Sequence, residues 1–205
     1  VVAGRTESRE KVYDVPERAL GDPGVAIGDF ARWALLERVE AAGLLTRASG
    51  AMWSMLSSVR TSSLVDDLIN EGALVEVQLE DSARRYLAKP SFLKQRRAQY
   101  DDRIRILGPL DPLLWDRDLV RHAFEFDYVW EVYKPERQRR WGWYVCPLLQ
   151  RDRLIGRIDA RIERGTLIVR KIWMEDGFED VDVAATLERH ALLCGAKKVR
   201  MPRRR

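Results

Sequence analysis

The chain has 205 residues, 46% of them hydrophobic and 33% charged, which is the balance of a globular protein with a core. No apolar run approaches the roughly 18 residues of a membrane-spanning helix. The N-terminus has no apolar signal segment, so the sequence predicts neither a transmembrane helix nor a secretory signal. Because the chain begins at Val1 and continues like the middle of a protein, we expect a piece of a longer or processed chain.

The net charge of +4 comes from the C-terminal end of the chain. Residues 197–205 carry six positive side chains and no acid, and without them the net charge falls to −2. The folded body is thus not basic as a whole, and any nucleic-acid footprint has to be a local patch. The basic end fits a solvated terminus as well as a binding arm.

The sequence predicts no metal site and no cofactor. Cys146 and Cys194 lie in apolar stretches and are expected as buried, reduced thiols. His122 and His190 share no metal-ligand spacing with them. The chain also lacks Gly-rich phosphate loops and the Gly-x-Ser-x-Gly motif, so a self-contained enzyme is not expected.

Residues 1–28 are polar and broken by proline and glycine, which predicts an extended linker. Residues 29–99 predict three helices and then a β-hairpin, at 29–43, 51–56, 62–71 and 75–88. This is the order of a winged helix-turn-helix, in which the third helix reads DNA and the hairpin is the wing.

The charges of this predicted winged-helix domain do not favour DNA binding. Its third helix and wing present more acids than bases, namely Asp66, Asp67, Glu71, Glu76 and Glu80 against Arg60, Arg84 and Arg85. Because acids repel phosphates, a scaffold or protein-contact role and a DNA-contact role both stay open. The basic run that follows, with Lys94, Arg96 and Arg97, fits either a solvated face or a DNA contact.

Residues 100–205 predict an antiparallel sheet domain. A strand near 104–107 and a helix at 117–124, capped by Asp116 or Asp118, come first. From residue 128 apolar residues alternate, which predicts a four-stranded antiparallel meander, and a helix at about 181–193 packs on it. The predicted fold class is α+β, with a winged-helix unit followed by an antiparallel sheet domain and a packed C-terminal helix.

A basic loop joins the first two predicted strands of the meander, in "WEVYKPERQRRWGWYVCPLL" (130–149). It holds four cations and ends on a tryptophan: Lys134, Arg137, Arg139, Arg140 and Trp141. One interpretation is a solvated hairpin, and the other is a hairpin that neutralises phosphates or inserts an arginine into a narrow minor groove. Trp141 fits a stacking wedge as well as a core residue, whereas Trp143 is expected in the core.

Four stretches of the sequence resemble one known family: "KVYDVPERAL" (11–20), "LDPLLWDRD" (110–118), "FDYVWEVYKPERQRRWGWYVCPLL" (126–149) and "RLIGRIDARIE" (153–163). Their content and order resemble the C-terminal half of bacterial AlkZ/YcaQ-type winged-helix DNA glycosylases, some of which unhook interstrand crosslinks. The resemblance implies a concave basic DNA surface that is assembled from several winged-helix units and a β-hairpin.

The catalytic motif of that family, a glutamine, an apolar residue and then glutamine or aspartate, belongs to its N-terminal half. The nearest string here, Gln78-Leu79-Glu80, lies on the predicted wing strand, so no catalytic residue is assigned to this chain. The resemblance implies a bacterial, cytoplasmic, nucleoid-associated parent protein. It also implies that this chain is a DNA-facing part whose partners are the N-terminal winged-helix domains of that parent.

The predicted function is therefore duplex DNA binding within a glycosylase that acts on alkylated or crosslinked DNA. The candidate DNA-binding residues are Lys134, Arg137, Gln138, Arg139, Arg140, Trp141, Arg60, Arg96 and Arg97. A winged-helix module that binds DNA or protein without chemistry is the alternative, and a purely structural domain is a third. No membrane partner is predicted, and the sequence indicates no oligomeric state.

Overall fold

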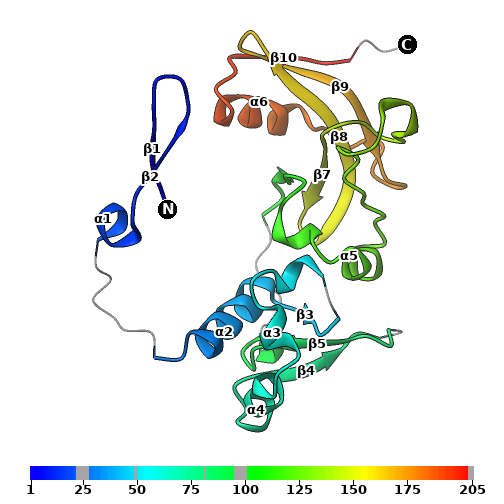
Figure 1. The fold of residues 1–205 in the computed structure, drawn as a ribbon. Helices are drawn as coiled ribbons and strands as arrows, with labels where there is room; N and C mark the ends of the chain where they lie inside the picture. The colour runs from blue at the N-terminus through cyan, green and yellow to red at the C-terminus, as the bar shows by residue number, and fades with distance from the viewer. Residues whose placement is uncertain (22–27, 49, 81, 95–100, 203–205) are drawn as a thin grey trace.

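The computed structural model describes residues 1–21, 28–48, 50–80, 82–94 and 101–202. These residues form an α+β fold with a group of helices and a small sheet, a larger sheet, and an N-terminal hairpin that stands to one side (Figure 1). The α+β fold class predicted from the sequence is confirmed. Within the described ranges, none of the helices has the length and apolar character needed to cross a bilayer.

The chain begins with a β-hairpin, where the sequence predicts an extended linker. β1 (Val2–Arg5) pairs with β2 (Lys11–Tyr13), and the short helix α1 (Pro16–Leu20) follows. The Thr6 N–H donates to the Glu10 carbonyl oxygen at 3.0 Å, and the Glu10 N–H donates to Thr6 Oγ1 at 3.1 Å, which closes the turn. The side chains of both strands are exposed. Residues 22–27 of the predicted linker lie outside the described residues.

The next unit surrounds one hydrophobic core. It contains α2 (Phe30–Ala42), α3 (Ser57–Arg60) and α4 (Leu64–Asn70), and a sheet of order β3-β5-β4 made by β3 (Leu45–Thr46), β4 (Val75–Gln78) and β5 (Arg85–Ala88). Asp29 caps α2 by accepting from the Arg32 N–H, as the sequence predicts, and α2 ends at Gly43 with φ +71°. Buried side chains from α2, α4, β3 and β5, and from the segment between β3 and α3, form the core, among them Leu35, Val39, Leu45, Trp53, Val65, Leu68 and Leu87. Helices followed by a hairpin are the predicted order, and the winged-helix assignment stays a prediction.

The larger sheet has the order β10-β9-β8-β7-β6. Its strands are β6 (Ile104–Ile106), β7 (Val145–Gln150), β8 (Arg153–Glu163), β9 (Thr166–Met174) and β10 (Lys198–Arg200). The antiparallel pairing of β7, β8 and β9 is as predicted. Helix α6 (Ala184–Leu193) buries Leu187 and Ala191 against the sheet, and it carries the chain back so that β10 pairs parallel to β9.

The first strand predicted for the meander is not formed, and this corrects the sequence analysis. Residues 128–133 pair with no strand in the described residues, and β6 occupies the edge beside β7. The alternation of apolar residues in this segment has another cause. Tyr128 is buried, and its hydroxyl donates to the Val145 carbonyl oxygen at 2.9 Å. The Glu131 carboxylate is buried too, and it binds backbone N–H groups of the following loop. The basic segment 134–141 is therefore a folded loop and not a β-hairpin.

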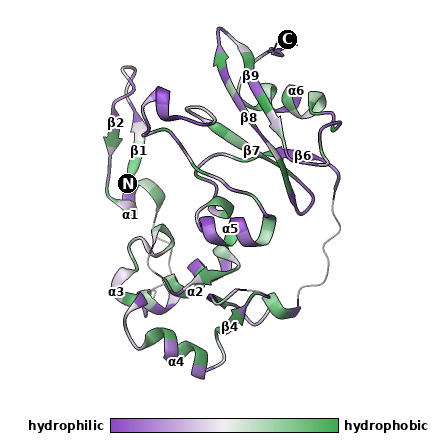
Figure 2. Cartoon of the chain, turned by 90° about the vertical axis from the view of Figure 1, so that its right-hand side faces the viewer, coloured by the Kyte–Doolittle hydropathy of each residue, from purple (hydrophilic) through white to green (hydrophobic). Residues whose placement is uncertain are grey.

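Helix α5 (Arg117–Phe124) lies between the helices and the larger sheet in both views (Figure 1, Figure 2). Asp116 caps it by accepting from the Leu119 N–H at 3.0 Å, as predicted. Arg84, beyond the β4–β5 turn, forms ion pairs with Asp116 and Asp118. A third hydrophobic cluster lies under this region, made of Leu107, Leu114, Val120, Phe126, Tyr128 and Leu154. It holds the start of the segment that leads into the basic loop.

Candidate nucleic-acid interface

The basic loop folds around the carboxylate of Glu131. Its Oε1 accepts from Lys134 Nζ at 2.9 Å and from the Arg140 backbone N–H at 3.1 Å. Its Oε2 accepts from the Trp141 N–H at 2.8 Å and the Gly142 N–H at 3.4 Å. One buried side chain thus ties both ends of the loop together, because Lys134 opens the loop and Trp141 closes it.

The charge of Glu131 is stabilised in this position. Burial raises the pKa of its carboxyl group, but hydrogen bonds from the backbone N–H of Trp141, from Lys134 and from the Arg140 and Gly142 N–H outweigh burial and hold the pKa at about 2. A buried carboxylate that accepts several N–H bonds stays ionised at neutral pH. The loop is therefore fixed from inside by a negative charge that is not presented to a ligand.

A stack of cations and rings holds the far end of the loop on the sheet. The guanidinium of Arg157, on β8, lies 4.1 Å from the ring centre of Phe126 and 4.1 Å from that of Trp141. It donates to the Asp127 carbonyl oxygen at 3.0 Å and to Glu175 Oε1 at 2.8 Å. Cations over aromatic faces attract the ring electrons, and the attraction strengthens when water is excluded. Arg157 is buried, so the stack belongs to the interior.

A second guanidinium, that of Arg140, also lies over the Trp141 ring. The guanidinium of Arg140 lies 4.5 Å from the ring centre, and the ring of Trp173, on β9, meets Trp141 edge-on at 5.4 Å. Trp141 is thus held by two arginines and a tryptophan. A wedge that enters a base step needs a ring free to leave its packing, so this arrangement favours a packing role for Trp141 over a wedge.

The predicted cations of the loop take two kinds of position. Arg139 folds back, because its Nε donates to the Lys134 carbonyl oxygen at 2.8 Å, and Lys134 itself is paired with Glu131. Arg137, Gln138 and Arg140 are exposed. The loop therefore uses Lys134 and Arg139 for its own structure and presents Arg137, Gln138 and Arg140 to solvent.

Four aromatic side chains beside the loop form what we call the aromatic platform: Trp130, Tyr133, Trp143 and Tyr144. Trp143 was expected in the core, and this is wrong, because 55% of its surface is exposed. It lies before β7 begins, where Gly142 turns the chain at φ +155°. A Cβ at Gly142 would lie 2.9 Å from Asp159 Oδ2 and 3.1 Å from Val145 Cγ2, and together with the positive φ these contacts favour glycine at this position.

Of the remaining predicted DNA-binding residues, the structure describes only Arg60, and it lies in the helical unit and not at this loop. Arg60, at the end of α3, is half-buried and donates to the Arg47 carbonyl oxygen at 3.4 Å. Acids of the helical unit are paired with arginines, as in Arg47–Asp66 at 2.9 Å and Arg32–Glu71 at 2.6 Å. Arg96 and Arg97 lie outside the described residues.

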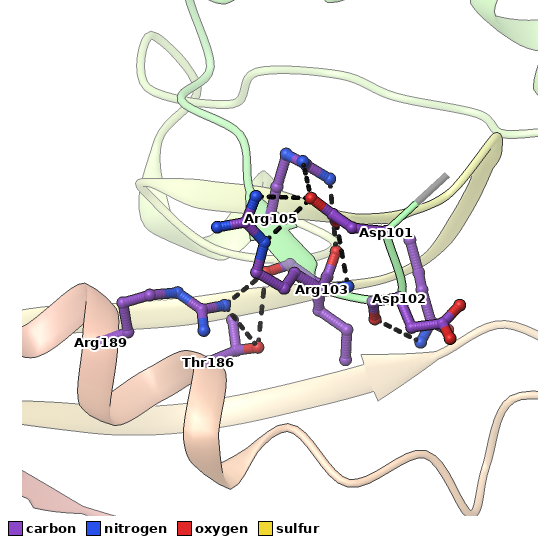
Figure 3. Close-up of polar contacts among 8 residues, drawn as sticks. Asp101, Asp102, Arg103, Arg105, Thr186 and Arg189 are labelled. Carbon is purple, nitrogen blue, oxygen red and sulfur yellow. Dashed lines mark hydrogen bonds and ion pairs between the residues drawn. The ribbon is translucent and has the colours of Figure 1, made fainter. Parts of the chain in front are cut away.

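A second group of arginines lies at the junction of β6 and α6 (Figure 3). Asp101 accepts from Arg103 Nε and Arg105 Nη2, both at 2.9 Å, and these bonds hold the pKa of Asp101 at about 2. Arg189 donates to the Ile104 carbonyl oxygen at 3.0 Å and, with Thr186, lines a cavity of about 240 Å³. Asp101 neutralises part of this charge, so the group ties β6 to α6 and is a weaker candidate interface than the loop.

The described residues contain no cluster of three or more His, Cys, Asp or Glu side chains that would hold a metal ion. In Gln78-Leu79-Glu80, Gln78 Nε2 donates to the Ser82 carbonyl oxygen at 2.7 Å, within the turn between β4 and β5. This bond stabilises the turn between β4 and β5.

A family model described as DNA glycosylase AlkZ-like matches residues 1–193. The chain belongs to the AlkZ-like DNA glycosylase family. Among solved structures, Streptomyces sahachiroi DNA glycosylase AlkZ resembles this AlkZ-like chain with a TM-score of 0.55 and 16% sequence identity. The match covers 97% of this chain and 53% of that chain, so the AlkZ-like chain spans about half the length of its solved relative. At this identity the likeness shows a shared fold, and the family resemblance seen in the sequence is confirmed.

The sequence analysis of the AlkZ-like chain missed Glu131 and Arg157, the two residues that organise the loop. The sequence analysis placed Glu131 within a predicted strand and gave no role to Arg157. A signal was present for Arg157, because it follows the buried run Leu154-Ile155-Gly156 and precedes the buried Ile158. An arginine inside such a run needs aromatic and carboxylate partners, and "FDYVWE" supplies aromatic ones.

Proposed function

We propose that the chain is the non-catalytic DNA-binding part of a bacterial DNA glycosylase that acts on alkylated or crosslinked duplex DNA. Its partners are duplex DNA and the N-terminal winged-helix domains of the same parent chain, which carry the catalytic motif. The parent protein acts in the cytoplasm, at the nucleoid. Family membership supports the repair setting, and the basic loop supports the contact with DNA.

The observation that carries the proposal is the buried Glu131 carboxylate at the centre of the loop. It fixes the backbone of Arg140 and Trp141 and leaves the side chains of Arg137 and Arg140 outside. Phosphate contacts position a protein on a duplex, and a cation on a fixed backbone loses little freedom when it makes one. Arg137 and Arg140 therefore contact the DNA backbone or the minor groove, and Gln138 lies between them as a neutral donor.

The alternative is a winged-helix module that binds DNA or protein without chemistry. The paired surface of the helical unit favours a scaffold role for that unit, because Arg47, Arg84 and Arg85 are all engaged with carboxylates. Cations already paired with acids have less to offer to phosphates. In both functions the DNA contact lies in the loop and not in the helices.

The proposal is tested by fluorescence anisotropy with a labelled duplex over a series of salt concentrations. The variant R137A/R140A removes both outward cations, and R85A is the matched control because Arg85 is an exposed arginine of the helical unit. We expect the slope of log K against log salt to fall by about two in the double variant and to stay unchanged in R85A. Equal slopes for the double variant and the wild type, or no duplex binding at low salt, would exclude the loop as the DNA contact.

A further inference from the structure

The aromatic platform (Trp130, Tyr133, Trp143 and Tyr144) has an unusual exposure for so many rings. The exposed fractions are 88% for Tyr133, 55% for Trp143 and 41% for Tyr144. Large rings gain most when they are buried, and contiguous exposed apolar surface marks interaction sites. The platform is therefore a candidate ligand-binding surface.

The rings contact one another mainly by their edges. Trp130 meets Tyr133 at 5.8 Å between ring centres with 64° between the planes, and meets Tyr144 at 6.4 Å with 85°. Trp143 and Tyr144 are tilted by 46° at 6.2 Å. In an edge-on pair, the ring that contributes its edge keeps both faces free of that contact. Tyr133 and Trp143, the two most exposed of these rings, therefore offer surface to a flat ligand.

Trp130 is the middle of the platform, and its orientation depends on packing. Its Nε1–H is buried and has no hydrogen-bond partner within the described part of the chain. Tyr133 and Tyr144 both pack against the Trp130 ring, so the position of Trp130 sets the positions of both tyrosines.

Positive charge lies next to these rings along the same loop. Tyr133 immediately precedes the basic loop, and Arg140 comes three residues before Trp143. Of the two acids in this stretch, Glu131 is buried and hydrogen-bonded, and Glu136 is exposed, so the cations outnumber the acids that a ligand meets. Rings beside cations match a ligand with a flat aromatic part and a phosphate, and single-stranded nucleic acids are bound in this way.

We propose that the aromatic platform stacks on an unpaired base of DNA while the cations of the loop hold the adjoining phosphates. This inference rests on the proposed function and adds to it a preference of the chain for DNA with an unstacked nucleotide. In the interior of a paired duplex every base face is covered by its neighbours, so the platform has nothing to stack on there. A bulge or a strand end offers such a face.

The test compares three labelled DNAs of one sequence: a paired duplex, the same duplex with a three-base bulge, and the single strand. Y133L/W143L removes two platform rings and keeps apolar side chains. Y133F/W143F keeps flat rings at both positions. W33L is the matched control, because Trp33 on α2 is 45% exposed and pairs with Phe30 at 5.7 Å in the helical unit.

We expect the wild-type chain to bind bulged and single-stranded DNA about tenfold more tightly than the paired duplex, which corresponds to one stacked base. Y133L/W143L should lose this preference and keep its affinity for the duplex, whereas Y133F/W143F and W33L should keep the preference. Far-UV circular dichroism and the midpoint of thermal unfolding confirm that each variant is folded.

Several results would overturn the inference. If the wild type binds paired and unpaired DNA equally with a steep salt slope, the platform proposal fails and the loop proposal stands. If Y133L/W143L retains the preference, another surface reads the unpaired base. If that variant alters sedimentation but not DNA preference, the platform is a protein contact. If no DNA binds at low salt, the proposed function fails, and this inference fails with it.

Discussion

The guanidinium of Arg157 lies 4.1 Å from the ring centre of Trp141 in the interior of the protein. In the chain, strand β7 and the turn between β7 and β8 separate the two residues. The ring centre of Phe126 lies 4.1 Å from the same guanidinium. The buried cation joins three segments: the strand β8, the stretch that begins at Phe126 and the end of the basic loop. The position of the loop on the sheet therefore depends on a side chain that does not belong to the loop.

Replacement of Arg157 by lysine should destabilise the protein by roughly 2 kcal/mol. Lysine keeps the charge but loses the flat guanidinium that stacks on two rings and donates to both Asp127 and Glu175. Urea unfolding curves with equal slopes measure the difference. R153K, on the exposed part of β8, is the control and should change stability by less than about 0.5 kcal/mol. Equal midpoints for R157K and the wild type would contradict the structural role of the stack.

Replacement of Glu131 by glutamine should destabilise the protein in a way that depends on pH. The pKa of this carboxyl group is about 2 in the folded state against an ordinary value of 4.5, so its contribution is full above pH 4.5 and is lost as pH falls toward 2. That shift corresponds to a contribution on the order of 3 kcal/mol to the free energy of unfolding. The E131Q variant lacks this dependence, since an amide does not titrate.

The measurement is the free energy of unfolding of both proteins between pH 7 and pH 3. The difference between wild type and E131Q should be largest near neutral pH and should shrink as pH falls below 4.5. E136Q is the control, because Glu136 is an exposed acid of the same loop. A difference that is constant over this range would mean that the carboxylate charge does not stabilise the loop.

Gly156 on β8 should not tolerate a methyl group. A Cβ at this position would lie 2.5 Å from the carbonyl oxygen of Trp173, and backbone atoms of the neighbouring strand have no room to move away. We expect G156A to destabilise the protein by roughly 2–4 kcal/mol and to lower the thermal midpoint accordingly. G108A should be nearly neutral, since nothing lies within 4 Å of its Cβ. A G156A protein as stable as G108A would show that β8 and β9 separate easily there.

The two cysteines should differ in reactivity. Burial, with a smaller effect of the Asp159 charge, raises the pKa of Cys146 to about 12, so its thiol stays protonated at pH 8. Cys194 was expected to be buried, but it follows the end of α6 and is exposed, 3.6 Å from His190 Nε2. Titration with a thiol reagent at pH 8 should detect one fast thiol in the native protein and two in denaturant. C194S should abolish the fast reaction, and two fast thiols in the native state would show that the partial burial of Cys146 does not protect its thiol.

Elements with local signals were predicted well from the sequence. The caps Asp29 and Asp116 and the stop at Gly43 lie at the ends of the helices that they limit, so they are visible in the order of residues. Strands β7, β8 and β9 follow each other through short turns, and alternation alone predicts them. In these elements each residue is specified by neighbours only a few positions away.

The candidate site was predicted only in outline. The alternation in "YVWEVY" is real, but its buried positions pack against a core and against a folded loop instead of a neighbouring strand. The cations of the loop were identified, whereas their division into structural and exposed members depends on Glu131. Contacts such as Arg157 with Trp141 join residues that are distant in the chain, and periodicity carries no information about them.

The parallel strand β10 has a consequence for self-association. It covers only the first three residues of β9, Thr166 to Ile168, so the later part of that edge has no partner strand in the described residues. An open sheet edge is a template for another chain, and lysine and arginine side chains discourage such pairing. Arg170 and Lys171 are exposed on this stretch of β9. The two cations therefore disfavour the addition of a strand from a second molecule at this part of the edge.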